Sequence, residues 1–367
     1  MELVCNQAGL LQASCGCAPP ACCPSSPPCP EGLCDPSPLS RYCTSNGQQY
    51  AGWQTGANQT LALVGRALII QLWRGRDAWN LDQQPQIHRV WASESLLSMR
   101  SWDGNAPASN FKNVGAGLVL GTDWSPGASW TLGILGGYTA GRQHWETLSG
   151  EGKSHAFALG FYGAWSNGAH RDNRNGWYAN LVGYGAAIRG VLDRMPLCQS
   201  MSTSLHGPAF AGTLEVGYRF YSEELHWQPF ASISPSWFRR HSFHEECGDP
   251  ALRMCGPSHL SWKPACGAGI RFATQTTSRS GIVTSPEFIL EFVQQLTNVT
   301  SCVDVGLCDT DTISRACGPP SPWTALYLGI GLFFRFSEHW HARIRVNSEH
   351  GEGMQRLTAI AQASVAF

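Results

Sequence analysis

The stretch that decides the fold is the end of the chain, Leu357-Thr358-Ala359-Ile360-Ala361-Gln362-Ala363-Ser364-Val365-Ala366-Phe367. Alternate side chains of a β-strand point to opposite faces, so residues of one parity share a face. One face is apolar and consists of Leu357, Ala359, Ala361, Ala363, Val365 and Phe367. The other face carries Thr358, Gln362 and Ser364. The pattern ends on an aromatic residue and predicts the closing strand of a membrane barrel, because an unpaired edge in lipid leaves backbone groups without partners.

The composition favours a barrel over a helical membrane protein. Charged residues make up 14% of the 367-residue chain, which also contains 40 glycines and 15 tryptophans; an average soluble protein has ~25% charged residues. The longest apolar candidate, 61–73, contains Gly65 and Arg66 and is shorter than the roughly 20 residues that a spanning helix needs. The net charge of −1 and the lack of a basic patch in the sequence give no indication of nucleic-acid binding.

From residue 88 onward the sequence divides into segments of alternating hydrophobicity that are separated by turn residues. The predicted strands are 90–102, 113–123, 129–140, 153–166, 176–190, 213–221, 226–240, 260–273, 286–296, 325–336, 339–348 and 355–367. We therefore predict an all-β fold, a twelve-stranded antiparallel transmembrane β-barrel over residues 88–367. If the first strand starts on the periplasmic side, the two longest connections, 241–259 and 297–322, lie outside, as outer-membrane barrels require.

Charged residues on the inward face indicate a wet lumen, because an Arg that faces lipid near the midplane costs roughly 2 to 4 kcal/mol. The predicted lumen charges are Glu215, Arg219, Glu291, Arg343 and Arg345. As structural residues they would brace the barrel by ion pairs. As functional residues they would set the field felt by a threading polypeptide or a permeating solute. Both interpretations stay open.

Residues 1–57 form a cysteine- and proline-rich segment that we expect to be irregular. Eight of the fifteen cysteines lie within residues 1–43. They indicate either disulfide crosslinking in an oxidising compartment or metal binding, although no matched pair of zinc-type C-x2-C motifs is present. The first twenty residues contain no Lys or Arg and no apolar core of a signal peptide. We therefore expect a longer precursor or a misplaced start.

The two longest connections hold candidate disulfide cysteines. Cys247 and Cys255 share the first connection, and Cys302, Cys308 and Cys317 share the second. Bridges within or between these loops would restrict segments of high conformational entropy.

Histidines raise the question of metal binding or catalysis. The candidates are His241, His244, Glu245 and Glu246 in one loop, and His339 with His341 at a turn. We predict solvated or interfacial polar residues here, with no metal and no cofactor. Outer-membrane phospholipases also use twelve-strand barrels, but no serine of this sequence stands in a recognisable nucleophile setting, so we expect no enzyme. We expect the tryptophans to lie at the level of the lipid headgroups. Sugar binding is the alternative role for them.

Several stretches of the predicted barrel resemble the C-terminal translocator domain of autotransporters. They are residues 90–93 (Val-Trp-Ala-Ser), 115–124 (Gly-Ala-Gly-Leu-Val-Leu-Gly-Thr-Asp-Trp), 132–138 (Leu-Gly-Ile-Leu-Gly-Gly-Tyr), 160–165 (Gly-Phe-Tyr-Gly-Ala-Trp) and 214–220 (Leu-Glu-Val-Gly-Tyr-Arg-Phe). Residues 228–230 (Gln-Pro-Phe) and 267–272 (Gly-Ala-Gly-Ile-Arg-Phe), with the many cysteines, are similar to chlamydial polymorphic membrane proteins. The Gly-Gly-Ala-Ile and Phe-x-x-Asn motifs of that branch's passenger are absent from the sequence, so we expect the cargo to lie outside it.

The resemblance implies a Gram-negative-type outer membrane, loops at the cell surface, and a barrel that supports export or display of an N-terminal passenger. It implies that the barrel-assembly machinery reads the terminal strand, Leu357 to Phe367. It also implies a linker at 58–87 with a pore helix at 58–80, for which Asn58 is a possible N-cap. Since Leu68, Ile69 and Ile70 are apolar for a polar lumen, a last turn of passenger structure is the alternative.

Two other functions remain open. One is a passive porin-like channel, and the other is a disulfide-crosslinked structural envelope protein that uses the barrel as its anchor. An open lumen would favour the channel, and extraction that depends on reduction would favour the structural protein.

Overall fold

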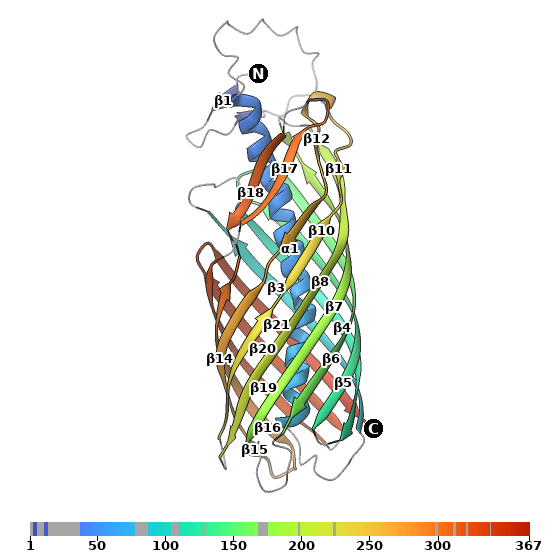
Figure 1. The fold of residues 1–367 in the computed structure, drawn as a ribbon, viewed down its shortest axis with the longest axis vertical. Coiled ribbons are helices and arrows are strands. Elements are labelled where there is room, and N and C mark those ends of the chain that lie inside the picture. Colours follow the sequence, from blue (N-terminus) through green and yellow to red (C-terminus); the bar gives the residue numbers. More distant parts are fainter. Residues whose placement is uncertain are drawn as a thin grey trace, which may run out of the picture.

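The computed structural model describes residues 3–5, 11–13, 37–77, 87–103, 110–127, 129–167, 175–196, 199–222, 225–297, 300–310, 313–320, 322–337 and 339–367. Its main body is a tall antiparallel barrel with a long helix inside (Figure 1). Near the N-terminus, β1 (Leu3–Cys5) and β2 (Leu11–Ala13) pair as a separate two-stranded sheet. The six cysteines within residues 14–36 lie outside the described residues.

Twelve strand positions surround the helix, as the sequence predicts. They are β3 (Ile87–Ser101), β4 (Phe111–Gly127), β5 (Trp130–Trp145), β6 (Gly150–Ser166), β7 (Gly176–Arg194), β8 (Met201–Tyr221), β9 with β10 (Leu225–Ser234, Ser236–Arg240), β13 with β14 (His259–Trp262, Ala265–Thr274), β16 (Val283–Gln295, extended by β15, Thr276–Thr277), β19 (Thr324–Arg335), β20 (Trp340–Gly351) and β21 (Met354–Ala366). Pro235 and Pro264 stand at the two interruptions, since proline cannot donate to a β-ladder.

The barrel closes between its last and first strands. β21 pairs with β3 from Met354 opposite Ser101 to Ala366 opposite Arg89. Beyond the end of β21, the backbone N–H of Phe367 donates to the carbonyl of His88 at 2.8 Å. The prediction of a closing strand is therefore confirmed.

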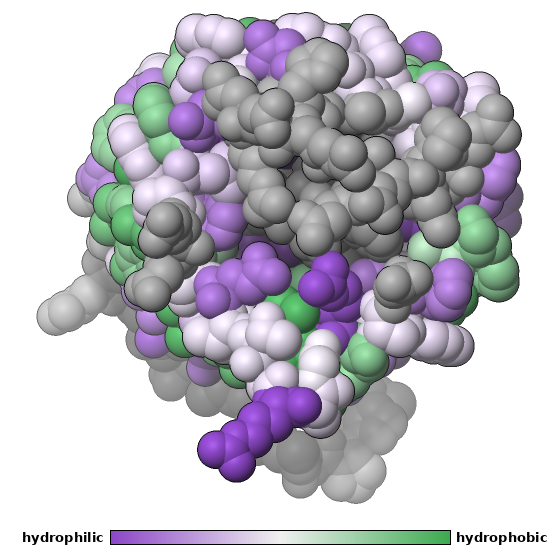
Figure 2. Space-filling view, turned by 90° about the horizontal axis from the view of Figure 1, so that it is seen from below, coloured by the Kyte–Doolittle hydropathy of each residue, from purple (hydrophilic) through white to green (hydrophobic). Residues whose placement is uncertain are grey.

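The outward face is apolar over most of its height. At the C-terminal end of the chain, Leu357 is 50% and Phe367 72% exposed, whereas Thr358 is 2% and Gln362 4% exposed. The outward positions become charged toward the end that carries the long loops, where Arg100, Lys112, Arg142, Glu146, Glu151 and Lys153 form surface ion pairs. From the opposite end, hydrophobic residues gather around the circumference (Figure 2). This change from apolar to charged marks where the wall leaves the lipid.

Several strands are longer than predicted, and β8 differs most. It begins at Met201 rather than at residue 213, and its inward positions, such as Met201 and Leu205, are buried. Of these side chains, Leu205 joins the buried core around the upper helix. The sequence does not predict a strand over residues 201–212, because Thr, Ser and His interrupt its apolar alternation.

The helix α1 spans Ser37–Asp77 and enters the barrel at the long-loop end (Figure 1). The expected irregular segment 1–57 is therefore wrong for residues 37–57, and the expected helix at 58–80 begins earlier. Three glycines, Gly47, Gly52 and Gly56, lower the intrinsic helix propensity of this part. Burial of neighbouring side chains such as Tyr50 and Trp53 overrides that propensity.

A small sheet covers the long-loop end. Its strands, in spatial order, are β11 (Phe243–His244), β12 (Met254–Gly256), β17 (Thr300–Leu307) and β18 (Ile313–Pro320), with a short 3-10 turn η4 (Pro250–Leu252) before β12. The sheet thus joins the loop between β10 and β13 to the loop between β16 and β19. Among the described residues, no helix has the length and apolarity to cross a membrane.

Candidate functional site

The helix packs against one sector of the lumen wall, formed by β4 to β7. Leu63 and Val64 belong to the same buried cluster as Val119, Ala156 and Tyr184. Glycine on the wall allows this approach: a Cβ on Gly141 of β5 would lie 2.6 Å from the Thr60 Oγ1 atom of the helix. Of the apolar run that seemed unsuited to a polar lumen, Leu68 joins this buried cluster, whereas Ile69 and Ile70 line a cavity on the other side of the helix.

Directed hydrogen bonds fix the upper helix to the same sector. The Asn113 amide donates to the carbonyl of Gly56 at 3.1 Å, and the Gln143 amide donates to the carbonyl of Trp53 at 3.3 Å. In return, the indole N–H of Trp53 donates to the carbonyl of Lys153 at 3.0 Å. These bonds set the height and rotation of the helix, which packing alone would leave free to slide.

Near its lower end the helix bonds to strands on both sides of the barrel seam. The Gln71 amide donates to Asp123 at 3.0 Å and accepts from Gln362 of β21 at 3.0 Å. Arg343 of β20 donates to the carbonyl of Ile70 at 2.7 Å. The helix is therefore held along its length.

A charged sector, formed by β8, β14, β16, β19, β20 and β21, faces the other side of the helix. Arg66 donates to Glu349 at 2.6 Å, and its guanidinium lies 4.6 Å from the ring centroid of Tyr327. Arg356 pairs with the same carboxylate and also bonds to Gln59 of the helix. One buried anion is thus shared between a helix cation and a wall cation.

The predicted lumen charges all lie on the inward face of the wall but do not form one site. Glu215 pairs with Arg271, which also donates to the Tyr178 hydroxyl at 3.1 Å. Arg219 stacks on the other side of this group, 4.9 Å from the Tyr178 ring centroid. Ser232 donates to Glu291 at 3.4 Å.

Two further predicted charges lie on β20. Arg343 pairs with Glu287 of β16 at 2.5 Å, and Arg345 donates to Asn347 at 2.7 Å. Sequence reasoning missed Arg271, Glu349 and Arg356 as partners. The alternation within each strand could have placed each of these residues on the inward face. Which partner each one meets depends on the register between neighbouring strands, which the sequence does not show.

A cavity of about 270 Å³ lies beside the helix on the charged side. Arg66, Glu215, Arg271, Glu291 and Glu349 are among its lining residues. The helix therefore fills most of the lumen but leaves a polar space along one wall.

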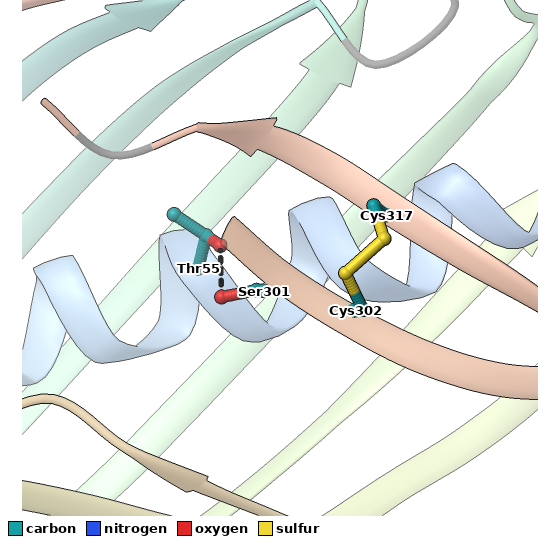
Figure 3. Close-up of a disulfide and its surroundings, with 4 residues drawn as sticks. All are labelled: Thr55, Ser301, Cys302 and Cys317. Carbon is teal, nitrogen blue, oxygen red and sulfur yellow. Dashed lines mark hydrogen bonds between the residues drawn. A yellow bond between two sulfur atoms is a disulfide. The ribbon is translucent and has the colours of Figure 1, made fainter. Parts of the chain in front are cut away.

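The loop hairpin β17–β18 packs on the upper helix (Figure 3). A disulfide joins Cys302 to Cys317, which stand opposite each other in the hairpin. Thr55 of the helix and Ser301 of β17 are hydrogen-bonded at 3.1 Å. A Cβ on Gly47 would lie 2.5 Å from both Ala316 and Val305, so only glycine permits this contact.

A buried ion pair ties the other long loop to the helix. Glu245 accepts from Arg194 of β7, from the Tyr50 hydroxyl at 2.5 Å and from the backbone N–H of Met254 at 2.7 Å. Its side chain is fully buried. The expectation that Glu245 is a solvated loop residue is therefore wrong.

The remaining candidates lie at both ends of the barrel. Cys247 is exposed, and Cys255 and Cys308 are partly buried free thiols. His341 faces inward and stacks on Phe333, whereas His339 lies at the strand end, where its ring is 3.1 Å from the carbonyl of Ala366.

The autotransporter β-domain model matches residues 91–347. This chain belongs to the autotransporter β-domain family. Its barrel is accordingly an outer-membrane domain of the Gram-negative type, as predicted from the terminal strand and the quoted stretches. The family match does not distinguish the chlamydial branch, which stays a prediction.

Solved translocator structures share the fold of this autotransporter domain. The translocator domain of the autotransporter NalP from Neisseria meningitidis has a TM-score of 0.66 at 14% identity, covering 85% of this chain and 98% of that one. The β-domain of the Bordetella autotransporter BrkA has a TM-score of 0.54 at 17% identity, covering 76% and 98%. The transport unit of AIDA-I from Escherichia coli has a TM-score of 0.51 at 13% identity, covering 81% and 97%. A comparison with curated proteins gave no match.

Proposed function

We propose that this protein is an outer-membrane translocator that supports export or surface display of a segment N-terminal to its helix. The observation that carries the proposal is the course of α1, which runs from the long-loop end, through a closed barrel, to the end where β3 begins. Whatever precedes Ser37 therefore leaves the barrel at the long-loop end. Membership of the autotransporter family and the likeness to translocator domains support this function.

The long-loop end is the cell-surface side in this proposal, and the terminal strand is the signal read by the barrel-assembly machinery. The role is mechanical rather than catalytic. The barrel anchors the chain in lipid, and the helix holds the exported segment and blocks the lumen after export.

The orientation is testable with two epitope tags on the full chain. A tag placed directly before Ser37 should be bound by antibody on intact cells. A matched tag at Ser280, in the exposed turn before β16 at the other end, should be bound only after the outer membrane is permeabilised. The opposite labelling pattern would overturn the proposal.

The porin-like alternative rests on the cavity of about 270 Å³ beside the helix. Conductance in planar bilayers separates the two functions. A chain that starts at His88 should conduct several-fold more than the full chain, because a helix about 10 Å across fills most of a twelve-strand lumen. Equal currents would favour the channel, and extraction of the full chain from envelopes only after reduction would favour the crosslinked structural protein.

A further inference from the structure

Three side chains of types that can bind a metal ion meet at the long-loop end, each from a different segment of the small sheet. They are His244 of β11, Cys255 of β12 and Cys308, which directly follows β17. Their ligand atoms all lie within 4.8 Å of one another. Thiolate and imidazole are the side chains that zinc prefers in proteins. We propose that His244, Cys255 and Cys308 bind one zinc-type divalent cation, whose fourth position is open to solvent.

The strand register explains why these residues meet. His244 stands directly opposite Cys255, and Cys255 stands directly opposite Gly306. Cys308 is two residues beyond Gly306, so it lies on the same face, at the diagonal position. Its backbone N–H donates to the carbonyl of Arg253 at 2.9 Å, which continues the ladder and holds Cys308 in this position.

The diagonal position suits a metal better than a disulfide. Disulfides need Cβ atoms about 3.5–4.5 Å apart, whereas diagonal neighbours lie farther apart, at roughly 7 Å between backbones. The hairpin β17–β18 provides the internal comparison, because Cys302 and Cys317 stand directly opposite and are bonded. Two thiolates on a tetrahedral zinc lie about 3.8 Å apart with Zn–S bonds of ~2.3 Å, which the separation of at most 4.8 Å between Cys255 and Cys308 nearly meets.

The ligand set differs from the acidic group that the sequence suggested. Glu245 is buried and bonded to Arg194 and Tyr50, so its carboxylate is not available to a cation. Its neighbour His244 is exposed and points to the other face of the strand. A cation here would join the loop between β10 and β13 to the loop between β16 and β19, and so stabilise the sheet that holds the upper helix.

The test uses the folded full chain in detergent with Co²⁺ as an optical probe and Zn²⁺ as competitor. We expect one equivalent of Co²⁺ to give thiolate-to-metal charge-transfer absorption that Zn²⁺ abolishes. H244A, C255S and C308S should each weaken Co²⁺ binding by ~10-fold or more. Loss of a residue that hydrogen-bonds to a metal ligand already lowers metal affinity by about this factor, and loss of the ligand itself should lower it at least as much. C247S is the matched control, because Cys247 is exposed in the same loop but outside the cluster; it should bind like the parent chain.

Folding of each variant is checked by the heat-dependent shift in gel mobility, which should not change. Mass mapping of unreduced peptides gives a second measurement. A Cys255–Cys308 disulfide in freshly isolated protein would overturn the proposal. So would absence of the charge-transfer band, or a band that persists in both C255S and C308S.

Discussion

The two sides of the lumen hold the same helix in different ways. On the β4 to β7 side, small and aliphatic residues pack directly on Leu63 and Val64. On the charged side, formed by β8, β14, β16, β19, β20 and β21, Arg66 reaches a carboxylate of the wall, and a cavity remains beside it. The packed side thus resembles the core of a soluble protein, and the charged side resembles a lined channel.

This difference teaches how an apolar helix is accommodated in a barrel whose wall alternates between lipid and lumen. Apolar packing stabilises the helix in the lumen but does not fix its height or rotation. The directional hydrogen bonds of Gln71, Arg343 and Glu349 fix both. In a translocator, a polar space on one side would let water follow an extended chain before the helix settles. Under the proposed function, the charged side would line the path of the exported segment.

The largest expected effect comes from the seam that joins the two sides. Phe367 bonds to His88 and presents its ring to the outside. Deletion of Phe367, or F367D, should reduce folded, heat-modifiable protein in outer-membrane fractions several-fold, because it removes the aromatic end of the closing strand and, in F367D, places a charge toward lipid. S364A, an inward change on the same strand, is the control and should keep its yield. Unchanged yield for F367D would contradict the role of the terminal strand in assembly.

The next effect concerns the charged side. E349Q removes the anion that Arg66 and Arg356 share, and leaves two cations close together in a buried place. Breaking such a pair on one side costs about 3–5 kcal/mol, so the free energy of unfolding in urea should fall by about that amount. The current through the full chain in planar bilayers should fluctuate more than in the parent, because the helix is held less firmly in the lumen. An E349Q chain as stable as the parent would show that packing alone holds the helix.

A pair of equal truncations compares the two sides directly. L63A removes a fully packed side chain, and the unfolding free energy should fall by about 3 kcal/mol, as for Leu→Ala in cores. I69A removes a side chain of the same size that lines the cavity, so its loss creates less new empty space, and its effect should be about half. Chemical denaturation of both variants in one detergent makes the comparison. Equal losses would mean that the cavity side is packed as tightly as the other.

The sequence predicts the strands of the barrel wall better than it predicts the helix and the loop contacts inside and above the lumen. Alternation over 113–123 or 355–367 is a local pattern, since one face meets lipid along the whole strand. The start of α1 does not follow from a local pattern, because Gly47 and Gly52 lower helix propensity and contacts with the barrel wall and with β17 and β18 compensate for it. The proximity of Cys255 to Cys308 depends on pairing between two separate loops, which no spacing within either loop reveals.

The smallest expected effect lies outside the lumen, at the rim where the strands leave the lipid. Glu151 pairs with Arg142 at 2.6 Å and with Lys153 at 3.3 Å, and the hydrogen bond from Arg142 holds the pKa of Glu151 below its usual range. A lowered carboxyl pKa adds stability at neutral pH that is lost as the pH falls through that pKa. E151Q should therefore lower the unfolding free energy by less than about 1 kcal/mol at neutral pH, and by nothing in acid or at high salt. The contrast with E349Q, measured in the same denaturation series, isolates what burial adds to an ion pair. A loss for E151Q as large as that for E349Q would contradict the distinction between a solvated rim and an enclosed lumen.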